Sequence, residues 1–396
     1  MKNSIQSILA SLNRRFPDIS FDVTFWDGRT EHFGNGNAVF TLIFKNKKAV
    51  KHVLARGTLG FGEEYTAGNI DVEGDLEKLI RIGIDPLYQD IEVSPLTKAS
   101  LAFSHITSLN TVRRAPANIS HHYDLGDDFY RYYLDKTMAY SCAYFRDAKD
   151  SLDDAQQQKY EHICRKLQLK EGESLVDIGC GWGGMLIYAA RHYGVTGVGC
   201  TISPNQARYA NAAINAEGLR EKITVLEADY RNIEGRFDKF VSIGMFEHVG
   251  RRFIPLFMKK ARTLLKPEGT GLLHTIGKEA DTPFDPWTKK YIFPGGHIPV
   301  LDHIVRSMGK ENLVPVDIEN LRIHYAATLD AWAKRLEDNR RRIAEMFDEK
   351  LVRMWRLYLN GSAAAFRWGD LRLYQILFTN GLNNSIPWTR EHIYRS

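Results

Sequence analysis

Several features that would assign this chain to a particular class of protein are absent from its 396 residues. It has four cysteines and no C-x-x-C pair, so we expect free thiols and no metal site. No run of 18 apolar residues is present, so we expect no transmembrane helix. The first residues lack the apolar core of a signal peptide, and the cytoplasm is therefore the expected compartment.

A large excess of one charge is also missing. The net charge is +5 and the pI is about 8.8, which suits contact with an anionic surface without distinguishing nucleic acid from lipid. Apolar residues make up 44% of the chain, which argues against disorder as the default state. A chain of this length is expected to form two or three domains.

The pattern of apolar residues changes along the chain and indicates three regions. Residues 1–86 are predicted to form a small α+β domain, with strands at 19–25 and 38–44. Residues 87–115 have few strong signals and are predicted to be a linker with some helix. Residues 116–396 are predicted to form the catalytic domain.

Within that last region, short apolar strands alternate with helices, which predicts a parallel sheet covered by helices on both faces. Ser203 followed by Pro204 is a typical start of a helix. The expected strands are 175–178, 196–202, 223–228, 239–243 and 270–275, and the expected helices are 151–167, 203–217, 253–265, 326–345 and 347–368.

A glycine turn follows the first of these strands. Gly179, Gly181 and Gly184 match the G-x-G-x-x-G pattern of dinucleotide-binding proteins, but residues 185–216 contain no acid to bind a ribose. This absence weakens a nicotinamide interpretation. Asp177 before the turn can face a cationic, amino-bearing ligand, and Asp229-Tyr230 can contact an adenine. These residues therefore favour a turn that binds S-adenosylmethionine over one that binds a dinucleotide, and over a tight turn that binds no ligand.

Six further motifs, in order, carry a family resemblance: the chain resembles the cyclopropane fatty acid synthases over about 117–380. They are HYDLGDDF at 122–129, YSCAYF at 140–145, DIGCGWG at 177–183, SIGMFEHVG at 242–250, LHTIG at 273–277 and HYAATL at 324–329. The resemblance implies a Rossmann-like class I methyltransferase domain with a parallel-rich, seven-stranded sheet. The N-terminal α+β domain would associate with lipid or mediate dimerisation.

The resemblance also implies a reaction, in which a methylene group passes from S-adenosylmethionine to the cis double bond of an unsaturated phospholipid acyl chain. The expected location is therefore peripheral, at the inner face of the membrane. The expected partner is a phospholipid bilayer and not nucleic acid, and a homodimer is left open. In the family, a bound bicarbonate is thought to act as the base.

The site residues implied by the resemblance fall into two sets. The bicarbonate would be held by Cys142, Glu247, His274, the backbone of Ile276, and Tyr325. The cofactor would be bound by Tyr123, Tyr140, Ser141, Gly179, Gly181, Trp182, Thr201, Gln206, Asp229 and Tyr230, together with Asp177 from the residue-level argument. Thr201 and Gln206 would serve the region of the missing ribose-binding acid.

Several alternatives stay open. Related enzymes stop at a methyl branch or a methylene group, and a catalytically silent lipid-binding protein is a hypothesis from another class. Mycolic acid synthases lack the N-terminal domain, and plant alkaloid N-methyltransferases differ around 274–277. Ser362 stands where many relatives carry a cysteine, which argues against a covalent cysteine there. Taken alone, Cys142 and His274 are ordinary core residues, and 340–342 (Arg-Arg-Arg) is a solvated helix face.

Overall fold

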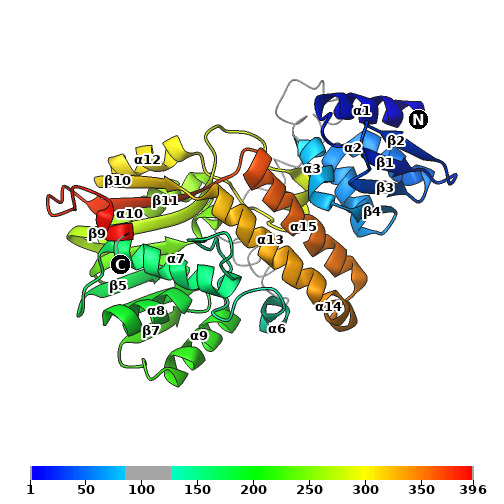
Figure 1. Ribbon diagram of the computed structural model, residues 1–396. Coiled ribbons are helices and arrows are strands. Elements are labelled where there is room, and N and C mark those ends of the chain that lie inside the picture. Colours follow the sequence, from blue (N-terminus) through cyan, green and yellow to red (C-terminus); the bar gives the residue numbers. More distant parts are fainter. Residues whose placement is uncertain (1, 85–125, 395–396) are drawn as a thin grey trace. The chain divides into compact units, whose positions relative to one another are not determined.

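The structure is a computed structural model that describes residues 2–84 and 126–394 (Figure 1). Contacts between residues divide the chain into two units. Within the described residues, unit 1 comprises 2–84, 283–294 and 329–370, and unit 2 comprises 126–282, 295–328 and 371–394. The predicted division differs in one respect, because it placed 283–294 and 329–370 with the catalytic domain. The predicted linker 87–115 and Tyr123 lie outside the described residues.

Unit 1 combines a small sheet with helices from distant parts of the chain. Its sheet has the order β2-β1-β3-β4, with β1 parallel to β3 and the other two pairings antiparallel. The elements are α1 (Lys2–Arg15), β1 (Phe21–Thr24), β2 (Thr30–Phe33), β3 (Phe40–Phe44), α2 (Lys47–Thr66), β4 (Ile70–Gly74), α3 (Leu76–Ile84), α11 (Pro286–Tyr291), α14 (Arg340–Met346) and α15 (Glu349–Trp368). Helix α13 (Arg322–Asp338) begins in unit 2 and continues into unit 1.

The core of unit 1 follows from the alternation seen in its first strand. Phe21 and Val23 lie two residues apart in β1 and so share one face of the strand, and both are fully buried. Helix α15 is attached by Arg353, whose guanidinium donates to the carbonyl oxygens of Tyr65 at 2.7 Å and Ile70 at 2.6 Å. Since those acceptors lie in α2 and β4, residues 349–368 are an integral part of unit 1.

Unit 2 is built on a seven-stranded sheet with the order β10-β11-β9-β8-β5-β6-β7 (Figure 1). The five strands from β9 to β7 are parallel, and β11 is antiparallel to both of its neighbours. The strands are β5 (Ser174–Ile178), β6 (Thr196–Thr201), β7 (Ile223–Glu227), β8 (Phe237–Ile243), β9 (Leu265–Gly277), β10 (Leu313–Asn320) and β11 (Arg372–Asn380). This is the predicted α/β architecture.

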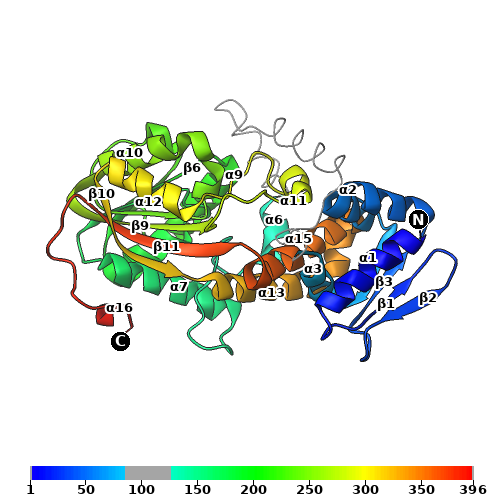
Figure 2. The ribbon, with the colours of Figure 1, turned by 90° about the horizontal axis from the view of Figure 1, so that it is seen from above.

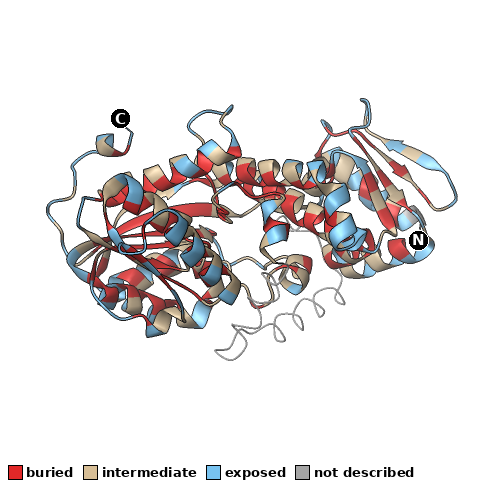
Figure 3. Cartoon of the chain, turned by 90° about the horizontal axis from the view of Figure 1, so that it is seen from below, coloured by how far each residue is buried: buried red, intermediate tan, exposed pale blue. Residues whose placement is uncertain are grey.

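Helices cover both faces of this sheet (Figure 2). One apolar core joins it to α7, α8 and α9, and a second core joins it to α10 and α12. In Figure 3 the buried residues are concentrated on the strands and on the helix faces turned toward them. The helices of unit 2 are α6 (Asp127–Arg131), α7 (Leu152–Leu167), α8 (Gly184–Tyr193), α9 (Pro204–Ala216), α10 (Ile254–Leu264), α12 (Leu301–Lys310) and α16 (Glu391–Tyr394).

Side-chain caps explain where two of these helices begin. Ser151 Oγ accepts a hydrogen bond from the backbone N–H of Asp154 at 3.1 Å, and Ser203 Oγ accepts one from Gln206 at 3.4 Å. Both caps satisfy an N–H group that the helix itself leaves unpaired, as the sequence predicts. No helix in 2–84 or 126–394 is long and apolar enough to cross a membrane.

The expectation for the C-terminal region is corrected in two places. Strands β10 and β11 were not assigned individually, because residues 300–396 show their strongest periodicity in the long helices. The predicted helix 326–345 is two helices, since α13 ends at Asp338 and α14 starts at Arg340. The antiparallel strand β11 pairs with the end of β9, from Arg372 with Gly277 to Thr379 with Thr270.

Candidate active site

A cleft opens at the carboxyl ends of the parallel strands of unit 2, where ligands bind in open α/β sheets. It holds about 1270 Å³ of space between atoms, including the part open to solvent, and ligand pockets typically have roughly 300–1,000 Å³. We call it the cofactor cleft. Ten of the eleven predicted cofactor residues line it: Tyr140, Ser141, Asp177, Gly179, Gly181, Trp182, Thr201, Gln206, Asp229 and Tyr230. Tyr123 lies outside the described residues.

The glycine turn brings the backbone to the floor of this cleft. Gly179 and Gly181 have φ values of 83° and 56°, which favour glycine. A Cβ atom on Gly179 would lie 2.5 Å from the side chain of Met245. The backbone N–H groups of Gly179 and Cys180 both donate to the carbonyl oxygen of Cys200 at 3.0 Å. The turn is therefore tied to β6 and needs glycine for steric reasons.

Asp177 ends the strand below the turn and is 1% exposed. Burial raises the pKa of its carboxyl to about 7, and the nearby ammonium of Lys159 opposes that rise. Its Oδ1 has no hydrogen-bond partner among the described residues. A buried polar atom that faces a cleft without a partner is suited to bind a polar group of a ligand.

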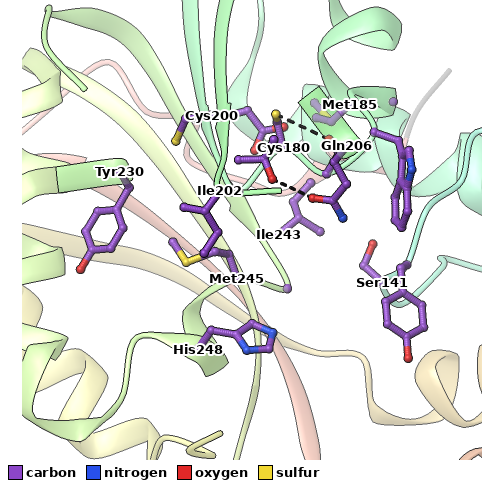
Figure 4. A pocket seen from close by; sticks show the side chains of 18 of the residues that line it. Ser141, Cys180, Met185, Cys200, Ile202, Gln206, Tyr230, Ile243, Met245 and His248 are labelled. Atoms are coloured by element: carbon purple, nitrogen blue, oxygen red, sulfur yellow. Dashed lines mark hydrogen bonds between the residues drawn. The ribbon is translucent and has the colours of Figure 1, made fainter. Parts of the chain in front are cut away.

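Hydroxyl and amide groups replace the missing acid at the end of β6. Thr201 Oγ1 donates to Gln206 Oε1 at 2.7 Å, and Gln206 points into the cleft in Figure 4. On the other side, Asp229 accepts hydrogen bonds from the backbone N–H of Arg231 at 2.9 Å and from its Nε at 2.7 Å. The guanidinium of Arg231 lowers the pKa of Asp229 against the opposing effect of burial. The carboxylate is thus ionised and held in place.

Aromatic rings form one wall of the cleft. Tyr140 and Trp182 line the cleft, and both pack on the buried Tyr130, whose ring centroid lies 5.5 Å from that of Tyr140 and 5.4 Å from that of Trp182. Trp182 Nε1 donates to Asp127 Oδ1 at 2.9 Å, which fixes the indole at the start of α6. Such a wall provides flat apolar surface beside the polar turn.

We call the five residues predicted to hold a bicarbonate the base group: Cys142, Glu247, His274, Ile276 and Tyr325. All of them except Ile276 are buried. None lines the cofactor cleft, but the neighbours Ser141 and His248 do. Glu247 follows β8, and its Oε1 accepts a hydrogen bond from the backbone N–H of Ile276 at 2.6 Å. Burial raises the pKa of Glu247 to about 7. Its Oε2 has no partner among the described residues.

His274 is fully buried in β9 and faces Gln375 across the β9–β11 ladder. Gln375 Nε2 lies 3.2 Å from His274 Nδ1, and His274 Nε2 has no partner among the described residues. Burial lowers the pKa of this imidazole well below its ordinary value, so the ring is neutral. If His274 Nδ1 accepts a hydrogen bond from the Gln375 amide, the single proton of the neutral ring is on Nε2. His274 Nε2 is then a hydrogen-bond donor.

Cys142 lies beside the start of α13, the helix that carries Tyr325. The carbonyl oxygen of Leu321 accepts a hydrogen bond from the backbone N–H of Tyr325 at 3.1 Å and lies 4.0 Å from Cys142 Sγ. Leu321 N–H in turn donates to Leu373, which pairs with Ile276 in the sheet. Burial raises the pKa of the Cys142 thiol, so it is not a thiolate nucleophile.

Two polar residues of this region were not predicted. Lys159 lines the cofactor cleft from α7, and Gln375 contacts His274 from β11. A signal for Lys159 was present, because it occupies the 3–4-residue spacing of the buried positions Leu152, Ala155 and Ile163. A charged residue at such a position is unusual unless it has a partner. No comparable signal marks Gln375, because β11 itself was not assigned.

Comparison with known proteins defines the class first. The structure matches that of mycolic acid cyclopropane synthase CmaA1 complexed with SAH and CTAB, with a TM-score of 0.63 and 33% identity over 67% of this chain and 98% of that one. Coclaurine N-methyltransferase shares the fold, with a TM-score of 0.61 and 21% identity over 81% and 98% of the two chains. The protein is an S-adenosylmethionine-dependent methyltransferase of the class I fold.

The family follows from the sequence. Residues 110–376 match the model of the family described as mycolic acid cyclopropane synthetase, and residues 8–86 match a domain of unknown function. The chain is 40% identical to the cyclopropane-fatty-acyl-phospholipid synthase of Escherichia coli, over 90% of this chain and 92% of that one. It is 37% identical to a probable fatty acid methyltransferase of Pseudomonas putida, over 93% and 95%. The chain therefore belongs to the cyclopropane fatty acid synthase family.

Proposed function

We propose that this protein forms cyclopropane rings on the cis double bonds of unsaturated phospholipid acyl chains, with bicarbonate as the base. The observation that carries the proposal is the base group, in which two buried polar atoms, Glu247 Oε2 and His274 Nε2, have no partner among the described residues. It lies beside a cleft suited to a methyl donor. The 40% identity to a cyclopropane-fatty-acyl-phospholipid synthase adds support.

The chemistry explains why such a group should be dry. An alkene is a weak nucleophile, and its attack on a methyl group leaves a carbocation that water would trap. Cys142 and His274 are fully buried, and Glu247 is 8% exposed, so this part of unit 2 excludes most water. Ring closure then requires loss of a proton from the added methyl carbon, and a base must lie within reach of it.

The cofactor cleft fits S-adenosylmethionine, which supplies the methyl group that becomes the third ring carbon. Asp177 offers an unpaired, buried carboxylate oxygen to an ammonium or sulfonium group. The glycine turn admits a ligand where a Cβ would clash. Asp229 and Tyr230 would contact the adenine, and Thr201 and Gln206 would contact the ribose.

The base group fits a small anion such as bicarbonate. The bound anion, and not a side chain of the protein, would then accept the proton from the added methyl carbon. His274 would donate from Nε2, and Tyr325 would donate its phenol. Ile276 N–H donates to Glu247 in this structure, so it reaches an anion only if that bond is shared. Because burial brings the pKa of Glu247 to about 7, its carboxyl can donate or accept a proton at neutral pH.

One relative supports a second candidate product, a methyl-branched or methylene acyl chain. The Pseudomonas putida relative, 37% identical, is described as a probable fatty acid methyltransferase. A methyl-branched or methylene product arises from the same methyl transfer, but the carbocation is resolved without ring closure. Only ring formation bonds the new carbon to both alkene carbons. A methylene product loses a proton from the new carbon without that second bond, and a methyl branch forms when a neighbouring chain carbon loses the proton instead.

A phospholipid substrate also implies contact with a membrane surface, and we place that contact on unit 1. Lys47, Lys48 and Lys51 are exposed at the start of α2. By contrast, Arg340 is ion-paired with Glu349, and Arg341 with Glu345, so the arginine run of α14 has little free charge. The start of α2 is therefore the better basic surface for anionic lipid.

The test is incubation of the protein and labelled S-adenosylmethionine with vesicles of a phospholipid that carries cis-unsaturated chains. Parallel samples contain a saturated phospholipid or the free unsaturated fatty acid. We expect label only in the unsaturated phospholipid, with sedimentation on anionic vesicles that weakens at high salt. Label in free fatty acid alone would contradict the substrate, and no label in any lipid would contradict the proposed reaction.

A further inference from the structure

A lysine is buried beneath the cofactor cleft. Lys159 lies on α7, is 1% exposed and lines the cleft. Its Nζ donates a hydrogen bond to Ser141 Oγ at 2.9 Å, and Ser141 lines the same cleft. A lysine is rarely buried to this extent unless a partner compensates its charge.

Among the described residues, that compensation is incomplete. No carboxylate oxygen of this part of the chain lies within 4.0 Å of Lys159 Nζ, whereas Lys166 on the same helix pairs with Glu319 at 2.6 Å. Asp135 acts on Lys159 electrostatically, but its oxygens accept hydrogen bonds from Thr137 and Ala139. An ammonium has three N–H donors, and Ser141 takes one. The ammonium also lies 4.4 Å from the centroid of the Tyr160 ring, and both residues line the cleft.

We infer that Lys159, together with the hydroxyl of Ser141, binds the carboxylate of the methionine part of S-adenosylmethionine. That part of the cofactor carries an ammonium and a carboxylate. Of the four charged side chains that line the cleft, Asp229 and Arg231 pair with each other, whereas Asp177 and Lys159 form no ion pair among the described residues. Asp177 has an unpaired oxygen for the ammonium. Lys159 has a single hydrogen-bond acceptor among the described residues, Ser141 Oγ, which leaves N–H groups of its ammonium for the carboxylate. The two side chains also interact electrostatically, as neighbours in one site do.

The charge state of Lys159 makes this binding pH-dependent. Burial lowers its pKa to about 8, against the opposing effects of Asp135, Cys142 and Asp177. Burial and, to a smaller extent, the charge of Lys159 lower the pKa of His274, whose imidazole is neutral. Lys159 is therefore a cation below about pH 8 and loses its charge above it, so affinity for a carboxylate should fall as the pH rises through 8.

A purely structural role predicts something different. Lys159 and Gln156 both bond to Ser141, since Gln156 Nε2 donates to the Ser141 carbonyl oxygen at 2.9 Å. If Lys159 only supported this segment, its loss would weaken all cofactor analogues alike. A ligand that lacks the carboxylate separates the two roles.

The experiment is calorimetric titration with S-adenosylhomocysteine and with its decarboxylated analogue, which keeps the ammonium. The proteins are the unaltered chain, Lys159→Met and the matched control Lys166→Met, whose lysine is buried on the same helix but bonds to Glu319. We expect Lys159→Met to lose about tenfold or more in affinity for the complete ligand, as for a charge-assisted hydrogen bond, and about twofold or less for the analogue. Lys166→Met should leave the ratio of the two affinities unchanged.

A second arm uses the unaltered protein and so does not depend on the folding of a variant. The affinity for S-adenosylhomocysteine, divided by that for the decarboxylated analogue, should fall above about pH 8. Equal losses for both ligands in Lys159→Met, or a ratio independent of pH, would overturn the inference. Neither arm contains lipid, so its result is separate from that of the proposed reaction.

Discussion

The cofactor cleft and the base group lie at the same edge of the sheet of unit 2, but they are built in opposite ways. The cleft is open, and its floor is backbone, with Gly179 and Gly181 in conformations that favour glycine. The base group is closed, and its working atoms are side-chain ends held away from water, such as His274 Nε2. The first arrangement suits a large ligand that brings its own polar groups. The second suits a small ion and an intermediate that water would destroy.

The two buried acids sharpen this comparison. Burial raises the pKa of both Asp177 and Glu247 to about 7. Asp177 is opposed by the charge of Lys159, whereas Glu247 is opposed by neutral hydrogen bonds, the first of them from Ile276 N–H. Asp177 is thus prepared to meet a cation and Glu247 to exchange a proton. Changes in one region should therefore affect donor binding and changes in the other should affect ring formation.

The largest effect is expected for Glu247→Gln. The amide keeps the shape and the bond from Ile276 N–H but cannot exchange a proton, so ring formation should fall by at least about 100-fold. Affinity for S-adenosylhomocysteine should stay within about twofold, because Glu247 does not line the cleft. Product lipids are measured by mass spectrometry and affinity by calorimetry.

Glu234→Gln is the control for this change, since Glu234 is exposed on the same unit. It should leave both quantities unaltered. Turnover of Glu247→Gln at the normal rate would show that the base group is assigned to the wrong residues.

A smaller effect on the other region is expected for Gly179→Ala. A Cβ would lie 2.5 Å from Met245, and a φ of 83° costs an alanine about 1–2 kcal/mol. We expect about tenfold weaker binding of S-adenosylhomocysteine. Gly218→Ala is the matched control, because Gly218 also has a positive φ, of 69°, but its Cβ would meet nothing within 4 Å. Equal loss of affinity in both variants would mean that the turn has no special role.

The smallest effect is expected for Gln375→Leu. Removal of the amide leaves His274 free to change tautomer, so ring formation should fall by about fivefold while donor affinity is unchanged. Gln375→Glu should not rescue the rate, because a carboxylate would draw the proton to Nδ1. The tautomer is read from imidazole ¹⁵N shifts, with exposed Gln157→Leu as the control. An unaltered His274 spectrum would refute this role of Gln375.

The sequence predicts four of the five parallel strands to within two residues at each end, because each is short and lies between turn signals. The fifth, β9, begins at Leu265, five residues before its predicted start. Thr196–Thr201 and Ile223–Glu227 fall within one residue of the predicted strands. It fails at β10 and β11, which have no turn signal strong enough to compete with the neighbouring helices. It also joins α13 to α14, because the break at Asn339 has no proline or glycine.

The candidate site shows the same limit. Motif residues such as Asp177 and Gly179 were predicted because their chemistry is local to one strand and turn. Lys159 and Gln375 were missed because their roles depend on contacts between distant segments, with Ser141 in one case and His274 in the other. Burial decides the protonation of Glu247 and His274, and no pattern of residue types gives burial directly.

The central claim is that the methyl carbon loses a proton and closes a ring, and isotope counting tests it directly. The protein is incubated with unsaturated phospholipid and S-adenosylmethionine carrying a trideuterated methyl group, and the acyl chains are analysed by mass spectrometry. The account predicts a chain that retains two of the three deuterium atoms and has no carbon–carbon double bond; a methylene product also retains two but keeps a double bond, which ozonolysis of the chain reveals. A chain that retains all three would be a methyl branch, and it would contradict ring formation by this protein.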